Sequence, residues 1–278
     1  MSRFATRIRQ AAARPSGYAD ETNTGVERFG LALTSYTGYG AFSTTEAFEA
    51  MSFSWSVMGN GYIRVDSGGH LTFTKCYINC KVDCDGANRS ATFIDCTIDG
   101  GGDVLAVGYN DITLIRCNVF NGIQCVNSSS NILIEDSYVH HPYLVPLSDG
   151  HVNPLFNGGG SNVVIRGSTF WSPVEDNGFG GGTTTNLSFF GDFAPVQDVL
   201  VENCFFKATP GAYGVTLGWN PGKPYGDNPT NVVFRNNVFE RGPTGQNAVY
   251  GPATSFLNAN GNQFYGNRYE DGEAIPIP

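Results

Sequence analysis

The sequence predicts an all-β chain whose short strands stack into a solenoid, and three observations carry this prediction. A nine-residue pattern recurs along the chain, its apolar positions alternate with period two, and one turn-forming residue interrupts the alternation at a fixed place. The eight copies cover residues 70–78, 90–98, 111–119, 131–139, 162–170, 198–206, 231–239 and 256–264. A supersecondary unit of roughly 20 residues that repeats with insertions is typical of a solenoid.

Each copy has a small or thiol residue near its end. These residues are Cys76, Cys96, Cys117, Ser137, Ser168, Cys204, Asn237 and Asn262. Apolar side chains stand five and three places before the small residue, as in Val163 and Ile165, and another stands two places after it, as in Phe170. Because side chains in a strand alternate between two faces, both apolar sets can face one interior only if the chain bends between them.

The residue just before the small one provides this bend. In five copies it is Asp95, Asp136, Gly167, Asn203 or Asn236. Asp, Asn and Gly are the residue types that tolerate left-handed backbone angles. We therefore expect two short strands that meet at a sharp corner, and not a helix, whose period would be 3.6.

Stacking such corners in register places equivalent residues above one another. The expected internal aromatic column consists of Phe170, Phe206, Phe239 and Phe264. A turn is expected to carry Asp111, Asn131, Asn162, Asp198 and Asn231. Their side chains are expected to bond backbone groups of neighbouring coils.

Composition narrows the possible partners. A continuous repeat over 278 residues favours one large domain. The net charge of −9 argues against a nucleic-acid partner, because no basic stripe exists to neutralise phosphates. No run of 18 apolar residues indicates a membrane span. No cofactor is expected.

The seven cysteines are expected to be reduced and buried. Cys76, Cys96 and Cys117 fall in one interior column of consecutive coils, where the spacing would also permit a disulfide. A solenoid with its own core has little need of such a bond, and a free Cys packs as a small hydrophobic residue. Cys80 and Cys84 extend the series without a Cys-x2-Cys pair, so no metal site is expected.

Residues 1–17 are expected to form an N-terminal helix that caps the solenoid or docks a partner, ahead of a solenoid domain at residues 18–278. Phe4, Ile8 and Ala12 recur at helical spacing, and the open end of a solenoid needs a cover. This stretch lacks the apolar run of a secretory signal. Residues 16–61 are expected to be irregular, with the first full strand at residues 62–65.

A third strand follows each copy, and the long insertions fall beside it. The third strands are expected at residues 104–107, 122–126, 154–157, 187–190, 214–217 and 247–250. Insertions at residues 140–150 and 171–185 precede this strand, and residues 219–229 follow it. Because long loops in compact domains usually serve a function, we expect them to wall a groove on the face of the third strand.

The loops carry residue types suited to acid and base chemistry. Asp149 lies in the first insertion and His151 directly follows it, and Glu175 and Asp176 lie in the second. A histidine with carboxylates could supply base and acid, and two carboxylates about 5–9 Å apart could cleave a glycosidic bond. The alternative is that these side chains are solvated or bond the loop backbone.

Aromatic residues near the groove are stronger indicators of sugar binding. The candidate substrate-binding residues are Tyr143, Phe156, Trp171, Trp219 and Tyr225, with Gln124 and Asp192 as polar partners. Sugar rings stack on aromatic faces, and exposed aromatic residues beside polar groups are costly unless used.

Two segments carry a resemblance to a known family. Residues 149–154 (DGHVNP) followed by residues 158–165 (GGGSNVVI), together with the turns at residues 23–26 (NTGV) and 33–38 (LTSYTG), resemble segments of minor tail proteins from actinobacterial phages and of related secreted actinobacterial β-helix proteins. That group belongs to the pectate-lyase-like superfamily. The resemblance implies a single-stranded right-handed parallel β-helix of about eight or more rungs.

The sequence departs from the enzymes of that superfamily. Asn153 stands where the related pattern has an aspartate two places after the histidine. Calcium-dependent pectate lyases of the superfamily carry carboxylates on the outward face of the third strand, where they bind Ca2+. The outward residues of the third strands in this chain lack such carboxylates. Of the polygalacturonase pattern only Gly150 and His151 are present.

The resemblance therefore implies a phage minor tail protein, located in the virion, that binds host cell-surface polysaccharide or cell-wall glycan. Its further partners would be other virion tail proteins, and the resemblance leaves a homotrimer open, because such proteins are often trimers. One alternative is a polysaccharide lyase or glycoside hydrolase that acts outside the cell, and another is a purely structural spacer.

Overall fold

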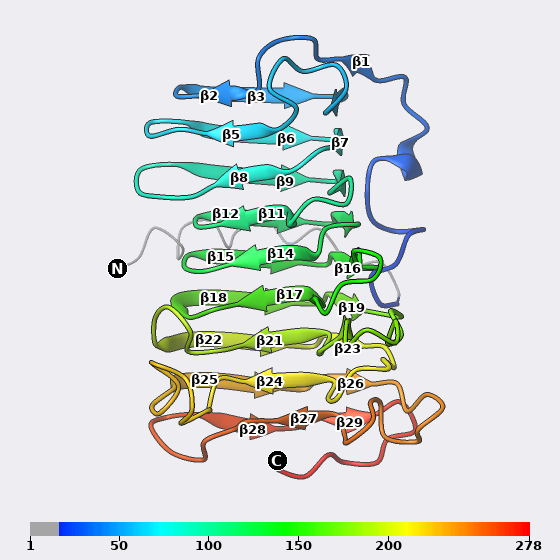
Figure 1. The fold of residues 1–278 in the computed structure, drawn as a ribbon, viewed down its shortest axis with the longest axis vertical. Helices are drawn as coiled ribbons and strands as arrows, with labels where there is room; N and C mark the ends of the chain where they lie inside the picture. Colours follow the sequence, from blue (N-terminus) through cyan, green and yellow to red (C-terminus); the bar gives the residue numbers. More distant parts are fainter. Residues whose placement is uncertain (1–16) are drawn as a thin grey trace.

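The computed structural model describes residues 17–278, and within them the chain is all-β apart from one 3-10 helix, η2 (Glu27–Phe29). The N-terminal helix expected from the sequence lies outside the described residues, except for its last position, Gly17. The strands form three long sheets (Figure 1).

The three sheets, named A, B and C, each take one strand from every coil. Sheet A consists of β1 (Thr34–Ser35), β4 (Met51–Ser54), β7 (Tyr77–Asn79), β10 (Thr97–Asp99), β13 (Asn118–Phe120), β16 (Tyr138–His140), β19 (Thr169–Trp171), β23 (Phe205–Phe206), β26 (Val238–Phe239) and β29 (Arg268–Tyr269). Sheet B consists of β2 (Ala41–Phe42), β5 (Ile63–Val65), β8 (Val82–Cys84), β11 (Leu105–Tyr109), β14 (Gln124–Ser128), β17 (His151–Asn157), β21 (Leu187–Phe189), β24 (Val215–Leu217) and β27 (Ala253–Thr254), with β20 (Gly182–Thr183) beside β17. Sheet C consists of β3 (Thr45–Glu49), β6 (His70–Thr74), β9 (Ser90–Ile94), β12 (Ile112–Ile115), β15 (Ile132–Glu135), β18 (Gly160–Arg166), β22 (Val196–Glu202), β25 (Thr230–Arg235) and β28 (Gln263–Tyr265).

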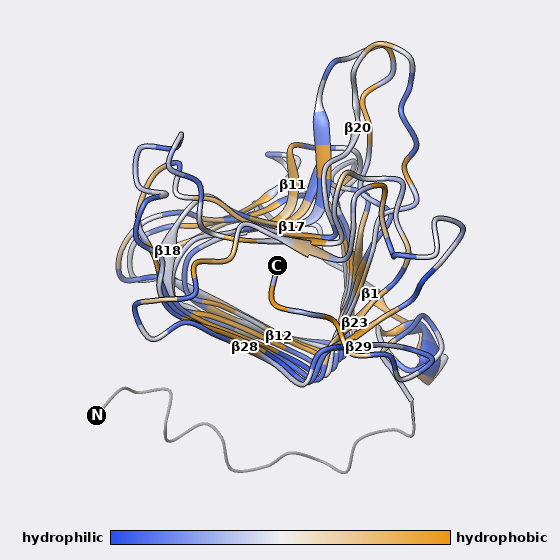
Figure 2. Cartoon of the chain, turned by 90° about the horizontal axis from the view of Figure 1, so that it is seen from below, coloured by the Kyte–Doolittle hydropathy of each residue, from blue (hydrophilic) through white to orange (hydrophobic). Residues whose placement is uncertain are grey.

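The chain runs through sheets C, A and B in turn, as in β15, β16 and β17, and then starts the next coil. Strands of successive coils pair in parallel and in register, so that Ile134 lies beside Ile165, and Val139 beside Phe170. Figure 2, which looks along the stack, shows the three sheets around one interior. This all-β arrangement is consistent with a parallel β-helix solenoid.

The corner predicted from the sequence is present. The residue before the small one has a positive φ, which is 56° at Asp95, 47° at Asp136 and 60° at Gly167. Residues on both sides of the corner, such as Ile134 and Val139, are fully buried. The change of parity therefore turns both strands toward the same interior.

The small residues complete the hydrogen bonding of the corners. The Ser137 hydroxyl accepts a bond from the Cys117 backbone N–H at 3.0 Å, and Ser168 does the same for Ser137 at 3.0 Å. Farther along, Asn237 Oδ1 accepts from the Cys204 N–H at 2.9 Å. A bend removes a backbone donor from the sheet, so a side chain of the next coil satisfies it.

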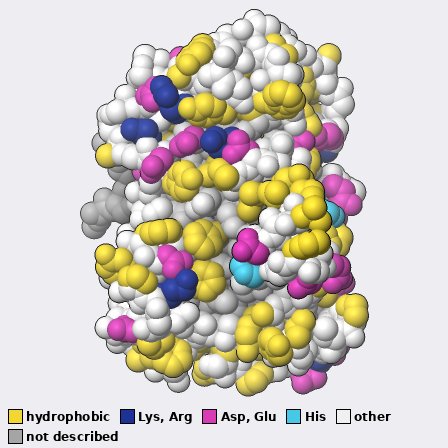
Figure 3. All heavy atoms as spheres, viewed as in Figure 1, with side chains coloured by type: hydrophobic (Ala, Val, Ile, Leu, Met, Phe, Trp, Pro, Cys, Tyr) yellow, Lys and Arg dark blue, Asp and Glu magenta, His cyan; other side chains and the backbone are white. Residues whose placement is uncertain are grey.

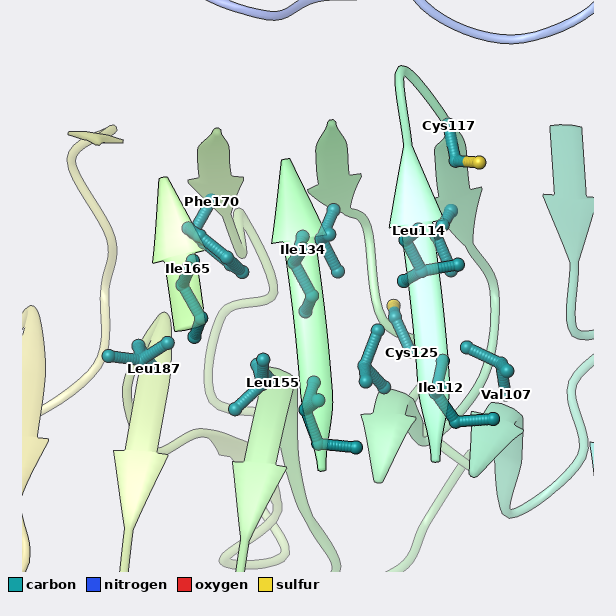
Figure 4. Close-up of a cluster of buried hydrophobic side chains, with 14 of the residues drawn as sticks. Val107, Ile112, Leu114, Cys117, Cys125, Ile134, Leu155, Ile165, Phe170 and Leu187 are labelled. Carbon is teal, nitrogen blue, oxygen red and sulfur yellow. The ribbon is translucent and has the colours of Figure 1, made fainter. Parts of the chain in front are cut away.

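The interior is apolar and contains the cysteines. Figure 4 shows side chains from different coils meeting there, among them Ile112, Leu114, Ile134 and Ile165. All seven cysteines are free and buried, as expected from the sequence. Burial raises the pKa of Cys117 to about 12, so this thiol is neutral and unreactive near neutral pH.

The structure corrects four expectations about the ends of the repeat. The last corner residue is Gly266, so Asn267 and not Asn262 is the small residue of the final copy. Phe264 consequently lies beside Phe234, and Tyr269 takes the place beside Phe239. The last third strand is β27 and not residues 247–250, and the repeat already begins with β1 to β4 in the region expected to be irregular.

The turn column of Asn and Asp residues also differs in detail. These residues have positive φ, as expected for a turn. Within residues 17–278 their side chains make hydrogen bonds to each other and none to backbone groups. Asn162 Nδ2 donates to Asn131 Oδ1 at 2.9 Å, and Asn231 Nδ2 donates to Asp198 Oδ1 at 2.9 Å. An amide side chain can both donate and accept a hydrogen bond, so neighbouring residues of this column can pair with each other.

The outer face of sheet A is covered by residues 17–29, here named the N-terminal segment. Tyr18 stacks on Phe205 with ring centroids 4.6 Å apart, and the Gly25 N–H donates to the Arg116 carbonyl at 2.9 Å. Arg28 and Arg116 both pair with Asp95, the latter at 2.7 Å. In residues 17–278 no helix is both long and apolar enough to cross a bilayer.

Candidate functional site

Loops border the outer face of sheet B on both sides. The loops that lead from sheet A cover residues 141–150 and 172–186, and the loops that lead on to sheet C cover residues 190–195 and 218–229. Figure 2 shows the loop with β20 rising well above sheet B. Figure 3 looks onto this side of the molecule, where hydrophobic and charged side chains are interspersed.

The first two loops are joined to each other. His151 in β17 lies beside Gly182 in β20, and the Gly182 N–H donates to the Gly150 carbonyl at 3.1 Å. Asn177 Nδ2 donates to the Ser148 carbonyl at 2.8 Å. The two insertions therefore form one wall along this edge of sheet B.

Asn153 anchors this wall to the sheet. Its Oδ1 accepts bonds from the Thr185 N–H at 3.1 Å and from the Ser188 hydroxyl at 3.2 Å, and its Nδ2 donates to Gln124 Oε1 at 3.1 Å. Gln124 in turn donates to the His151 carbonyl at 3.2 Å. Asn153 is 3% exposed. Asn153 thus has a structural role here.

The four candidate catalytic residues lie on this wall. Asp149, His151, Glu175 and Asp176 are all exposed. Asp176 Oδ1 accepts the Gly178 N–H at 2.6 Å, which is a bond to the loop backbone. Among the described residues no hydrogen bond or ion pair joins any two of these four side chains. The sequence brings them to one wall, and a catalytic role stays a prediction.

The opposite edge of sheet B presents aromatic side chains. Phe193 is 78% exposed, Tyr225 49% and Trp219 40%. Phe156 faces outward from β17, with its ring centroid 6.0 Å from that of Phe190. Phe190 and Phe193 were missed by sequence reasoning, although Phe190 ends the third strand predicted at residues 187–190 and Phe193 lies three positions after it.

An ion pair fixes the two aromatic loops to each other. Asp192 and Lys223 are 2.7 Å apart, and Lys223 Nζ lies 5.2 Å from the Phe190 ring centroid. The Tyr225 N–H donates to the Gly191 carbonyl at 2.8 Å. Asp192, expected to bind substrate, therefore also holds the loop that carries Tyr225.

Two of the other candidates lie away from the aromatic edge. Trp171 ends β19 in sheet A, where Lys207 Nζ lies 3.7 Å from its ring centroid and His141 packs edge-on at 4.5 Å. Tyr143 lies on the first wall loop, against Gly102. The structure therefore spreads the sequence-predicted aromatic residues over two faces.

His140 and His141 form a neutral pair at the base of the first loop. His140 Nε2 lies 2.7 Å from Asn118 Oδ1, and His140 Nδ1 lies 2.5 Å from His141 Nδ1. Burial, with smaller contributions from His141 and Lys207, lowers the pKa of His140 to about 3. Burial also lowers the pKa of His141. Both rings are therefore uncharged at neutral pH.

Within residues 17–278 no group of three or more His, Cys, Asp and Glu side chains is placed to hold a metal ion. Comparison of the chain with family models, curated proteins and solved structures finds no match.

Proposed function

We propose that this protein is a right-handed parallel β-helix, of the pectate-lyase-like kind, that binds a polysaccharide along the outer face of sheet B. The carrying observation is the aromatic edge, where Phe193, Tyr225 and Trp219 are exposed on two loops that an ion pair holds together. Exposed aromatic faces beside polar groups suit the apolar faces and hydroxyls of sugar rings.

Binding is better supported than cleavage. The aromatic edge is preorganised by backbone and ion-pair contacts, whereas within residues 17–278 no hydrogen bond or ion pair joins the side chains of Asp149, His151, Glu175 and Asp176. A base and an acid need a fixed mutual geometry, and a nucleophile or water must lie within reach of both. The sequence resemblance adds the biological setting that we propose: a virion tail protein that assembles with other tail proteins and contacts cell-wall glycan of the host.

The test measures retention of the purified chain on actinobacterial cell-wall glycans by affinity electrophoresis. The double variant Phe193→Ala and Tyr225→Ala should weaken retention at least about tenfold, because each lost aromatic contact is worth roughly 1 kcal/mol. The matched control is Tyr265→Ala, since Tyr265 is 45% exposed but lies in β28 of sheet C. Equal retention of both variants and the parent chain would refute the proposed binding face.

Cleavage remains the second candidate, favoured by the joined loops that bring two insertions with carboxylates and a histidine to one wall. Incubation with the same glycans should then release reducing or unsaturated ends, and His151→Ala should abolish the release. Product formation that survives His151→Ala would exclude the proposed role of His151. No product from the parent chain would leave binding alone.

A further inference from the structure

A cavity lies on another side of the molecule, between the N-terminal segment and sheet A. Its volume is about 620 Å³, and it is lined on one side by residues 17–23 and on the other by Tyr138, Thr169, Phe205 and Lys207. Small-molecule sites usually occupy roughly 300–1,000 Å³. None of the residues proposed for glycan binding on sheet B takes part in it.

The N-terminal segment leaves this space because it is fixed to the sheet at two separate points. Tyr18 stacks on Phe205 at one end, and Gly25 bonds the Arg116 carbonyl at the other. Between them the chain forms a turn closed on itself, in which Asp20 Oδ1 accepts the Thr22 N–H at 2.8 Å and the Asp20 carbonyl accepts the Thr24 N–H at 3.1 Å. The turn spans the sheet without filling the space beneath it.

The side of the cavity formed by the sheet carries a hydroxyl without a partner. Tyr138, Thr169 and Phe205 are direct neighbours on β16, β19 and β23. Thr169 is 2% exposed, and its Oγ1 has no hydrogen-bond partner among the described residues. Buried polar atoms are almost always paired, so an unpaired one beside a cavity points to a bound polar group.

The charges around the cavity are mixed. Lys207 is held over the Trp171 ring, and within residues 17–278 no carboxylate lies at ion-pair distance from its amine. Asp20 and Glu21 line the opposite side. Because acidic and basic groups both line the cavity, neither an anionic nor a cationic ligand would meet complementary charge alone. An uncharged polyol, whose hydroxyls both donate and accept, suits amine, carboxylate and hydroxyl together.

We propose that this cavity binds one uncharged sugar unit, with the Thr169 hydroxyl and the Lys207 amine as its polar contacts. The site is separate from the polysaccharide-binding face proposed on sheet B, and it does not depend on that proposal. It would give the molecule a second carbohydrate contact on a different side.

The test uses saturation-transfer NMR on the full chain with glucose, galactose and N-acetylglucosamine, and with glucuronate and glucosamine as charged counterparts. At least one uncharged sugar should bind, and its charged counterparts should bind more weakly. Thr169→Val should weaken binding about tenfold, because the sugar loses one buried hydrogen bond. The fold should tolerate this change, since valine has the same shape and removes an unpaired polar atom.

The matched control is Thr216→Val, because Thr216 is also buried with an unpaired hydroxyl but belongs to sheet B. This control and the variant Phe193→Ala with Tyr225→Ala should bind the single sugar like the parent chain. Lys207→Met keeps an aliphatic chain over Trp171 and should also weaken binding. This variant tests the site even if Thr169→Val disturbs folding. The proposal fails if no uncharged sugar binds, if Thr169→Val and Lys207→Met both bind normally, or if the sheet B variant loses the signal.

Discussion

The outer faces of sheets A and B are built from the same repeat but are finished in different ways. Sheet A is covered by the chain itself, through a segment that is distant in sequence and is tied down by Asp95. Sheet B is bordered by loops inserted into the coils, which are tied to each other through Asn153 and through the pair of Asp192 and Lys223. In this solenoid the covered face is made by the N-terminal segment, which packs across sheet A. The accessible face is made by longer loops between the strands of sheet B and their neighbours.

The largest effect on this comparison is expected from replacing Asp95, which holds the N-terminal segment on sheet A. Asp95→Ala leaves Arg28 and Arg116 without their shared carboxylate, whose side chain is 10% exposed. Loss of one partner of a buried ion pair is expected to cost about 3 kcal/mol of unfolding free energy. Urea unfolding measures this loss, and trypsin should cut at Arg28 more quickly than in the parent chain.

The matched control for Asp95 is Asp271→Ala. Asp271 also pairs with an arginine, Arg241, at 2.6 Å, but its side chain is 51% exposed. Exposed pairs contribute little, so the unfolding midpoint should not move. An equal loss in both variants would mean that the coverage of sheet A is not what makes Asp95 important.

A second effect arises from His140, which lies where the two faces meet. Its pKa is about 3 in the folded chain and about 6.5 when unfolded, so the unfolded state binds more protons between these values. Stability is therefore full above pH 6.5 and falls as the pH decreases toward 3, with a loss of about 2 kcal/mol by pH 5.

Urea unfolding at pH 7 and pH 5 measures the contribution of His140. His140→Gln should remove most of the acid-dependent loss, whereas His151→Gln at the exposed start of β17 should retain it. If the parent chain were as stable at pH 5 as at pH 7, the buried neutral state of His140 would be disproved.

The smallest of the three effects concerns the anchor of sheet B. Asn153→Ala leaves the Thr185 N–H and the Ser188 hydroxyl without their acceptor, which is expected to cost about 1–2 kcal/mol. Hydrogen exchange should increase in residues 182–188 and stay unchanged in sheet A. The control Asn127→Ala, from the same face of sheet B, should leave the exchange of residues 182–188 unchanged.

The fold was predictable because one local rule recurs. Side chains alternate between two faces along each strand, and the bend between the strands turns both Ile134 and Val139 to the interior. The Asp, Asn and Gly residues at the corner indicate this bend in the sequence. The same rule failed in the last copy, because asparagine is acceptable as the small residue, as Asn237 shows, and Asn262 instead lies directly before β28, where its Oδ1 accepts the Val232 N–H at 2.8 Å. Asn262 was therefore mistaken for Asn267, although Gly266 directly before the latter is the better corner residue.

The candidate site was less predictable because it depends on contacts between distant segments. Nothing local to Asn153 indicates that its side chain holds residues 185 and 188, and nothing near Tyr18 places it over Phe205. Trp171 is different, since it lies three positions after Ser168. Its parity alone assigns it to the outside of sheet A and could have separated it from the other aromatic candidates.

The register between coils has a consequence for any long ligand. Asn127, Phe156 and Ser188 are direct neighbours across three coils, and adjacent strands lie about 4.8 Å apart. A linear polymer along the stack whose own repeat matches a multiple of this step would meet equivalent positions over its whole length. A polymer with another repeat would lose this match within a few units. The stack would therefore favour polymers whose repeat length fits the spacing of the coils.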